Sequence, residues 1–219
     1  MADGDKLLKI LQDKLYASVV SDVLDAQGLH DQAMSARLRP LSPESRVIGR
    51  AHTVLTADVY ARPAEPYRLE IEAVDTLKPG DVMVAMTNDS QRTCFWGELL
   101  STAATARGAT GCVIDGHTRD VRRIIEMGFP VFCTGIRPVD SSYRSVVVDY
   151  NVPIMCGGVR VSPGDVIFGD FDGIVVIPRE ALEKTVDLAL TKVESEDHSR
   201  AMLQQGHLLR DVYDKFGVL

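Results

Sequence analysis

The 219-residue chain is predicted to form a layered α/β domain with helices at both ends. Its middle part, residues 82–133, alternates short apolar runs with helical segments in a β–α–β–α–β succession, which is typical of parallel strands joined by short connections. Residues 145–177 then form a run of short strands separated by tight turns, which favours antiparallel neighbours and therefore a mixed sheet. After Pro178 the composition shifts from Gly-rich to charged and helical. The sequence thus predicts an α/β core with an N-terminal helix and a C-terminal helical extension.

Periodicity and turn residues predict the individual elements. Residues 6–27 are predicted as one helix, because Leu and Val recur at helical spacing and Gly28 follows as a C-cap. Residues 31–46, which include Pro40 and Pro43, and residues 92–96 are predicted as loops. The predicted strands cover residues 47–58, 82–86, 111–114, 130–133, 145–149, 154–161, 166–170 and 173–177. The other predicted helices cover residues 70–77, 97–107, 119–127, 179–204 and 207–215.

Composition and charge restrict the class of protein. A hydrophobic fraction of 45% and a charged fraction of 25% predict a packed core rather than disorder. The formal net charge of −7 disfavours binding to nucleic acid, because phosphate contacts need clustered Lys and Arg. A small anionic ligand remains compatible with this charge, since two local cations can dominate a pocket.

The cysteines and the N-terminus predict a soluble, cytoplasmic protein. The four cysteines include no CxxC pair, and three lie in apolar strand-like runs, so free thiols in a reducing compartment are expected. The first residues, MADGDKLLKI, lack the features of a secretory signal. No apolar window approaches the ~18 residues of a membrane span. We therefore expect no membrane partner.

The segment at residues 96–121, WGELLSTAATARGATGCVIDGHTRDV, carries the most chemical information. Gly97 opens a predicted helix, so the backbone N–H groups of Glu98, Leu99 and Leu100 have no intrahelical acceptor. These donors and the positive end of the helix dipole form a site for an anion. The alternative for Glu98 is that it serves only as a first-turn carboxylate of this helix.

A second helix start follows at Arg119 and Asp120, after a strand that ends at Asp115. Ligands of open α/β sheets bind where strands end and helices begin, so both helix starts are expected to face one crevice. The forked guanidinium of Arg119 suits a planar carboxylate or an enolate oxygen. Asp120 is a hard oxygen ligand that suits Mg²⁺ or Mn²⁺, and a single carboxylate implies an ion that keeps several waters. The alternative is that Asp120 only caps its own helix.

These motifs together resemble the RraA-like family, whose members were once widely labelled menaquinone methyltransferases. The residues that carry the resemblance are Gly97, Glu98, Leu99, Leu100, Ser101, Gly108, Gly111, Asp115, Gly116, Arg119 and Asp120, with the stretches at residues 129–132, 161–165 and 170–178. The resemblance covers roughly residues 47–178, and the helical tail at residues 179–219 fits the longer members. It implies a single domain over residues 1–219 with a swivelling β/β/α fold, and a homotrimer or a hexamer built of trimers.

The resemblance also implies an activity. Family members include metal-dependent class II aldolases that cleave 4-hydroxy-4-methyl-2-oxoglutarate and 4-carboxy-4-hydroxy-2-oxoadipate and that decarboxylate oxaloacetate. Carried over, the backbone amides of residues 97–100 would hold the 2-oxo acid, and Arg119 would contact its 2-oxo group or enolate. Asp120 would bind Mg²⁺ or Mn²⁺ directly or through water. Arg119 and Asp120 are the expected catalytic residues, because a fixed cation and a metal stabilise the charge of a pyruvate enolate.

The base that deprotonates the 4-hydroxyl group is left open by the sequence. A metal-bound water is the simplest candidate, and Asp115 could orient such a water or could only cap its turn. Glu194, Glu196 and Asp197 in the tail could reach the metal of a neighbouring subunit, although charge runs of this kind usually form a solvated helix face.

A regulatory protein without catalysis is the alternative function. The namesake of the family inhibits RNase E by protein contact and shares the Arg-Asp pair, so that pair does not separate the two functions. The namesake is shorter and lacks a long helical tail, whereas this chain has both the tail and the Glu98 loop. These features favour an enzyme. A third interpretation is an enzyme of a sugar-acid route that acts on a different 2-oxo acid.

Overall fold

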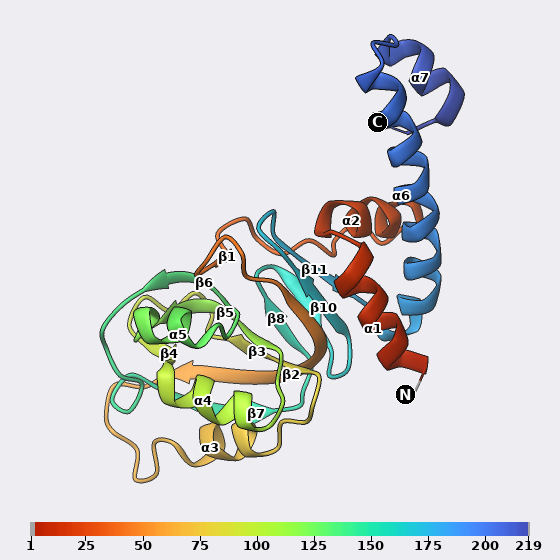
Figure 1. Ribbon diagram of the computed structural model, residues 1–219. Helices are drawn as coiled ribbons and strands as arrows, with labels where there is room; N and C mark the ends of the chain where they lie inside the picture. The colour runs from red at the N-terminus through yellow and green to blue at the C-terminus, as the bar shows by residue number, and fades with distance from the viewer. Residues whose placement is uncertain (1–2, 219) are drawn as a thin grey trace.

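A computed structural model describes residues 3–218 as a curved mixed sheet with a helical arm at one side (Figure 1). The sheet has the strand order β1-β6-β5-β3-β2-β10-β11, with β4 paired to β5 and β7 paired to β2, while β8 and β9 form a separate hairpin. The strands are β1 Arg39–Pro40, β2 Val47–Asp58, β3 Asp81–Met86, β4 Cys94–Trp96, β5 Gly111–Thr118, β6 Val131–Ile136, β7 Ser145–Tyr150, β8 Ile154–Cys156, β9 Val159–Val161, β10 Val166–Gly169 and β11 Ile174–Ile177. The helices are α1 Asp3–Lys14, α2 Ala17–Ala26, α3 Arg68–Asp75, α4 Glu98–Ala106, α5 Val121–Met127, the 3-10 turn Arg179–Ala181, α6 Leu182–Gln204 and α7 Leu209–Phe216.

The centre of the sheet is parallel and its margins are antiparallel. β3 pairs in parallel with β2 and β5, and β5 pairs in parallel with β4 and β6. β1, β7, β10 and β11 are added in antiparallel orientation. The β–α–β–α–β succession and the mixed pairing predicted from the sequence are both confirmed.

The alternation of side chains along the central strands produces three layers. In β3, Met83 and Ala85 pack against the face covered by α3, α4 and α5, whereas Val82 and Val84 pack toward the β8–β9 hairpin on the opposite face. Both faces of this strand are therefore apolar, as expected for a parallel strand covered on two sides. The predicted layering of two β layers and one α layer is confirmed.

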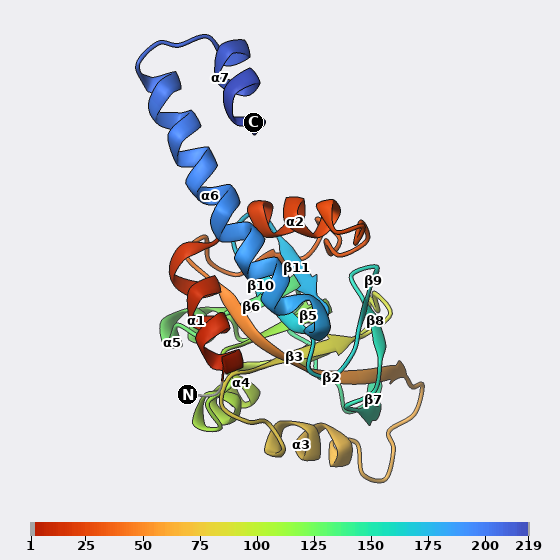
Figure 2. The same cartoon turned by 90° about the vertical axis from the view of Figure 1, so that its right-hand side faces the viewer.

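The terminal helices form the arm, of which α1, α2 and the first part of α6 lie against β10 and β11. Phe168 of β10 is fully buried in a cluster with Leu24 of α2 and Val186 of α6. Beyond this contact, α6 extends away from the sheet and carries α7 at its far end (Figure 2). β4, α4 and α5 lie on the other side of the molecule from the arm (Figure 1). Within residues 3–218, no helix is both long enough and apolar enough to cross a membrane.

Two elements predicted as continuous are divided in the structure. The helix predicted over residues 6–27 is split into α1 and α2, because Tyr16 is extended and the Asp170 carboxylate accepts the N–H of Ala17 at 2.8 Å. The strand predicted over residues 154–161 is the β8–β9 hairpin, in which Gly157 and Gly158 adopt positive φ angles of 57° and 84°. Consecutive glycines with positive φ are typical of a two-residue hairpin turn.

Three differences from the prediction affect the region of the Arg-Asp pair. The predicted loop at residues 92–96 contains β4, which pairs with β5. β5 itself continues to Thr118 rather than ending near Asp115. The helix predicted from Arg119 begins only at Val121, because Asp120 has the left-handed conformation with φ 58°. Arg119 and Asp120 therefore lie in a short loop between β5 and α5, rather than in the first turn of the helix.

Candidate functional site

A cavity of about 330 Å³ lies where β4 ends and α4 begins. Its lining comes from α3, the β4–α4 junction, the loop between β5 and α5, and the loop after β6. Among the predicted site residues, Gly97, Leu99, Leu100, Arg119 and Asp120 line this cavity. The structure thus brings the start of α4 and the loop that carries Arg119 and Asp120 to one cavity, although this loop was predicted as a second helix start.

The backbone at the start of α4 offers hydrogen-bond donors to this cavity. Gly97 is extended, and the first backbone bond of the helix runs from Ser101 N–H to Gly97 O at 3.1 Å. The N–H groups of Glu98, Leu99 and Leu100 precede that bond and have no intrahelical acceptor. Asp120 accepts the N–H of Glu98 at 3.2 Å. The N–H groups of Leu99 and Leu100 are left for an anion at the positive end of the helix.

The side chain of Glu98 is directed elsewhere. Its Oε1 accepts the hydroxyl of Thr102 one turn further along α4, at 3.0 Å, and Glu98 is not among the residues that line the cavity. Glu98 therefore takes part in the site through its backbone, whose N–H is already bound by Asp120.

Gly97 allows the β5–α5 loop to lie directly on the start of α4. A Cβ atom at this position would be 2.8 Å from Asp120 Oδ2 and 3.2 Å from Arg119 Cγ. The loop is fixed from the other side as well, because Arg119 N–H donates to Trp96 O at 3.0 Å. A glycine is required here by close approach, since any larger residue would displace the two side chains of greatest chemical interest.

Asp120 does not cap its own helix. Its carboxylate makes no capping bond to α5, and Oδ2 instead accepts Glu98 N–H and lies 3.5 Å from Arg119 Nε. Asp is one of the few non-Gly residues that tolerate a left-handed backbone. The second oxygen, Oδ1, has no hydrogen-bond donor among the described residues, and the side chain is partly exposed. That oxygen is available to a cation.

The protein donors for a metal are few. Across residues 3–218, no group of three or more His, Cys, Asp or Glu side chains is arranged to hold an ion. Asp120 would be the single protein ligand, as the sequence predicts for an ion that keeps most of its water. Mg²⁺ is commonly bound in this way, through one or two carboxylates and several waters.

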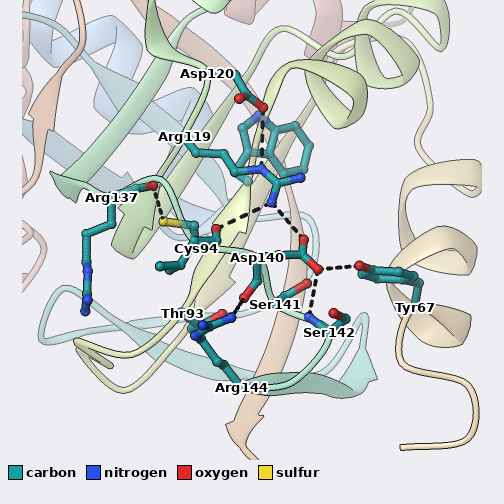
Figure 3. A network of polar contacts seen from close by, with 12 residues as sticks. Tyr67, Thr93, Cys94, Arg119, Asp120, Arg137, Asp140, Ser141, Ser142 and Arg144 are labelled. Atoms are coloured by element: carbon teal, nitrogen blue, oxygen red, sulfur yellow. Dashed lines mark hydrogen bonds and ion pairs between the residues drawn. The ribbon is translucent and has the colours of Figure 1, made fainter. Parts of the chain in front are cut away.

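Arg119 is held between two carboxylates, of which the sequence analysis identified only one. Figure 3 shows its guanidinium directed to Asp140, whose Oδ1 accepts Arg119 Nη1 at 2.8 Å. Asp140 in turn accepts the hydroxyl of Tyr67 and the N–H of Ser142. Asp140 lies in the loop after β6, in an Asp-Ser-Ser sequence of ordinary turn composition, so nothing in the sequence marks it as a partner of Arg119.

These contacts keep Asp140 ionised. Partial burial opposes its ionisation, but the hydrogen bonds from Tyr67 and Ser142 and the charge of Arg119 outweigh that effect and hold the pKa of Asp140 well below its ordinary value of 3.8. Arg119 therefore faces a fixed negative charge on each side, Asp120 and Asp140, and its Nη2 remains for a ligand.

Glu70 is a third carboxyl group in the cavity lining, and the sequence analysis did not identify it. It lies on α3 with 7% of its surface exposed, and Ser141 Oγ donates to its Oε2 at 3.4 Å. Burial raises the pKa of Glu70 to about 7. A signal was present in the sequence: residues 70, 73, 74 and 77 share one helix face, and the other three are apolar.

The other acidic residues considered from the sequence lie away from this cavity. Asp115 accepts Thr87 N–H at 2.6 Å and lines a separate hollow of about 250 Å³ with Arg37 and Asp89. Glu196 and Asp197 are on α6, where Glu196 accepts the hydroxyl of Tyr16 and Asp197 pairs with Arg200. Within one chain, neither Asp115 nor the tail approaches Arg119.

A larger cavity lies within the helical arm. It has a volume of about 470 Å³ and is enclosed by α2, α6 and α7, with a largely apolar lining that includes Leu203, Leu209 and Val212. Of the residues considered from the sequence, only Glu196 lines it, and none of residues 97–100, Arg119 or Asp120 does. We assign the chemistry to the smaller cavity, because charged groups and open backbone donors converge there.

Comparison with protein families decides the relationship that the motifs indicate. A family model described as RraA-like, Aldolase/RraA, matches residues 17–176, which is more than half of the chain. The chain belongs to the RraA-like family. The predicted resemblance is confirmed, and the matched region contains all the residues of the 330 Å³ cavity.

Individual relatives and a solved structure are similar over most of the chain. A Halalkalibacterium halodurans protein named "Putative 4-hydroxy-4-methyl-2-oxoglutarate aldolase" is 33% identical over 83% of this chain and 80% of its own length. Protein DlpA of Legionella pneumophila is 27% identical over 99% of this chain, which spans only 35% of DlpA. The crystal structure of Streptomyces coelicolor RraAS2, described as an unusual member of the RNase ES inhibitor RraA protein family, superimposes with a TM-score of 0.80 at 29% identity, covering 89% of this chain and 96% of that one.

The ionisation of Asp140 yields a prediction for stability. A carboxyl group whose pKa is lower in the folded state stabilises the fold above its unfolded pKa and loses that contribution as pH falls. Asp140→Asn should therefore lower the melting temperature at pH 7, and the difference from the wild type should narrow below pH 3.8. Thermal unfolding followed by circular dichroism at several pH values measures this, with the exposed Asp31→Asn as the matched control. A difference that stays constant down to acidic pH would contradict the assignment.

Proposed function

We propose that this protein is a divalent-metal-dependent class II aldolase that cleaves 4-hydroxy-2-oxo acids, such as 4-hydroxy-4-methyl-2-oxoglutarate, to pyruvate, and that it also decarboxylates oxaloacetate. One observation carries the proposal: Arg119, Asp120 and the backbone N–H groups at the start of α4 line the same cavity. The name of the Halalkalibacterium relative supports the same class of reaction.

The charges in the cavity favour a metal cofactor. One guanidinium, Arg119, faces the ionised Asp140, the carboxylate of Asp120 and the carboxyl group of Glu70. A dianionic 2-oxo acid would be repelled by this surplus of negative charge unless a cation came with it. Asp120 would hold Mg²⁺ or Mn²⁺ through Oδ1, which is a hard oxygen donor, and water would supply the remaining ligands. When bound, the ion supplies Lewis acidity at the 2-oxo oxygen.

The donors suggest how the common half of every substrate is bound. The carboxylate of the pyruvyl half would accept the N–H groups of Leu99 and Leu100 at the helix start. Arg119 would donate from Nη2 to the 2-oxo oxygen, where negative charge develops as the enolate forms. The distal half of the substrate would extend along the cavity, where Ile71 and the exposed side chain of Leu99 lie at its edge.

The test of this function is pyruvate release. The purified protein should release pyruvate from oxaloacetate and from at least one member of a panel of 4-hydroxy-2-oxo acids, measured with and without Mg²⁺. Pyruvate release from none of them, with a folded protein and added metal, would contradict the proposal.

Removal of the metal or of its proposed ligand should abolish turnover. EDTA should stop the reaction, and Mg²⁺ or Mn²⁺ should restore it. Asp120→Asn and Asp120→Ala should have the same effect as EDTA without unfolding the chain, because a helix-start hydrogen bond contributes only ~1 kcal/mol. Asp120→Asn is the sharper variant, since Asn also tolerates the left-handed backbone of this position. Full metal-dependent turnover in either variant would show that the ligand is another residue.

Arg119 should act on every substrate alike, because the pyruvyl half is common to all. Arg119→Lys keeps the charge, but one ammonium cannot bond Asp140 and the substrate with the planar geometry of the guanidinium. We expect kcat to fall by ~10²-fold or more for each substrate. Arg119→Ala should also weaken inhibition by oxalate, a planar mimic of pyruvate enolate. Unchanged oxalate inhibition in a folded, metal-binding Arg119→Ala protein would place Arg119 outside the site.

We also propose a homotrimer, or a hexamer of trimers, in a reducing cytoplasmic setting, with the whole chain acting as one domain. The arm supports an assembly because α6 and α7 project from the sheet (Figure 2). Leu208, Leu209 and Tyr213, at the start of α7 and within it, are exposed. The four cysteines are free and buried, which fits a reducing compartment. A monomer mass in light scattering at micromolar concentration would contradict the assembly.

A regulatory function without catalysis is the second candidate. It is supported by the similarity to RraAS2, which is described as belonging to an RNase ES inhibitor family. The two functions differ in the pyruvate assay: a regulator would leave oxaloacetate and the 4-hydroxy-2-oxo acids intact, with or without Mg²⁺.

A further inference from the structure

We propose that Glu70 is the proton carrier of the reaction, which takes the proton from the 4-hydroxyl group of the substrate and delivers it to C3 of the pyruvate enolate. This inference rests on the proposed aldolase function and names a residue for the role that the sequence left open. It is carried by the position of Glu70, a buried carboxyl group on α3 that lines the same cavity as Arg119 and Asp120.

The placement of Glu70 on α3 is unfavourable for packing alone. Glu70 is 7% exposed and points inward with Ala73 and Val74, whereas the neighbouring Ile71 is 54% exposed. The helix thus buries a carboxyl group and exposes an isoleucine, the reverse of the ordinary distribution. Ser141 donates one hydrogen bond of 3.4 Å to Glu70, although a buried carboxyl group can accept several. A buried carboxyl group with so few hydrogen bonds, on a helix that exposes an apolar side chain, is typical of a functional position.

The surroundings set the protonation of this carboxyl group. Burial raises the pKa of Glu70 to about 7, and the negative charge of Asp140 adds to the shift, whereas the hydrogen bond from Ser141 and the charge of Arg119 oppose it. The phenol of Tyr67 lines the same cavity, where its hydroxyl donates to Asp140. A carboxyl group that changes protonation near neutral pH is suited to take up a proton and return it in one turnover.

The proton transfer balances without any further reactant. In the cleavage step, the Glu70 carboxylate removes the hydroxyl proton, C4 becomes a carbonyl carbon, the C3–C4 bond breaks, and its electron pair forms the enolate of pyruvate. Protonated Glu70 then donates to C3, the 2-oxo group reforms, and the carboxylate is regenerated. Decarboxylation of oxaloacetate differs, because the C3–C4 bond breaks with loss of CO₂ and no proton has to be removed. In that reaction the proton at C3 can come from water.

The difference between the two reactions provides the test. Glu70→Gln keeps the size and the Ser141 contact but cannot carry a proton. We expect the rate of aldol cleavage to fall by ~10²-fold or more. The exchange of the pyruvate methyl protons in D₂O, followed by NMR, should slow by a similar factor. Oxaloacetate decarboxylation with Mg²⁺ should keep most of its rate, and oxalate should still inhibit. The matched control is Glu72→Gln, on the same helix but half-exposed and paired with Arg68, which should behave as the wild type in every assay.

The outcomes separate this inference from the function on which it rests. Cleavage and exchange at wild-type rates in Glu70→Gln would overturn the role of Glu70 and leave the aldolase function intact. Equal loss of cleavage, exchange and decarboxylation would also overturn that role, because it indicates that Glu70 acts only on the structure. A wild-type protein that neither releases pyruvate nor exchanges its methyl protons would overturn both proposals. If Glu70→Gln does not fold, the pH dependence of the wild-type rates provides the test. The rate of cleavage should decrease as pH falls below about 7, whereas the rate of decarboxylation should not. Identical pH profiles for the two reactions would overturn the assignment.

A measurement without turnover complements these assays. An acid whose pKa is raised on folding binds more protons in the folded state, so stability decreases as pH rises from its unfolded to its folded pKa. Wild-type melting temperature should therefore fall relative to Glu70→Gln between pH 4.5 and about 7 and run parallel to it outside that interval. Parallel curves throughout would show that Glu70 is not the buried titrating group described here.

Discussion

The candidate site depends on how the β5–α5 loop is seated on the first turn of α4. Asp120 accepts the N–H of Glu98, Arg119 donates from its backbone to Trp96 O, and Gly97 leaves the space that both side chains occupy. β4 pairs with β5, and this pairing holds the end of β5 beside the start of α4. The same contacts that close the fold at this point therefore aim a guanidinium, a carboxylate and two free backbone donors at one cavity.

The distribution of charge in the cavity explains why these groups belong together. Arg119 is balanced by Asp140 and Asp120, so it is held in place without leaving a net positive charge to attract anions from solution. The dianionic substrate that we propose would then need a cation, and Asp120 Oδ1 would be its ligand. The same negative surroundings, together with burial, disfavour a further charge on Glu70 and keep a proton available there near neutral pH.

The sequence predicted the parts of this arrangement that are local. The helix start at Gly97 and the neighbouring Arg119 and Asp120 are read from a few adjacent residues, and the parallel centre of the sheet follows from the β–α–β–α–β succession. The sequence did not reveal Asp140, which is twenty-one positions from Arg119 and reaches it only because the loop after β6 folds over the cavity. It also placed Arg119 in a helix, whereas Asp120 has a left-handed backbone and accepts the N–H of Glu98 from the neighbouring helix, so that α5 begins only at Val121. Glu70 was detectable in the sequence as an acidic residue on an apolar helix face. Only the packing of α3 beside the start of α4 shows that this residue lines the cavity.

The most direct test of the central claim is a crystal structure with Mn²⁺ and oxalate, in which anomalous scattering locates the metal. The account predicts a Mn²⁺ peak at coordination distance from Asp120, directly or through one water, and one oxalate carboxylate on the N–H groups of Leu99 and Leu100 with Arg119 beside the other. The Glu70 carboxyl group should lie beside the oxalate and face the position that C3 of a pyruvate enolate would take. Mn²⁺ and oxalate bound elsewhere, for example in the cavity between α2, α6 and α7, with the Arg119 site empty, would contradict it.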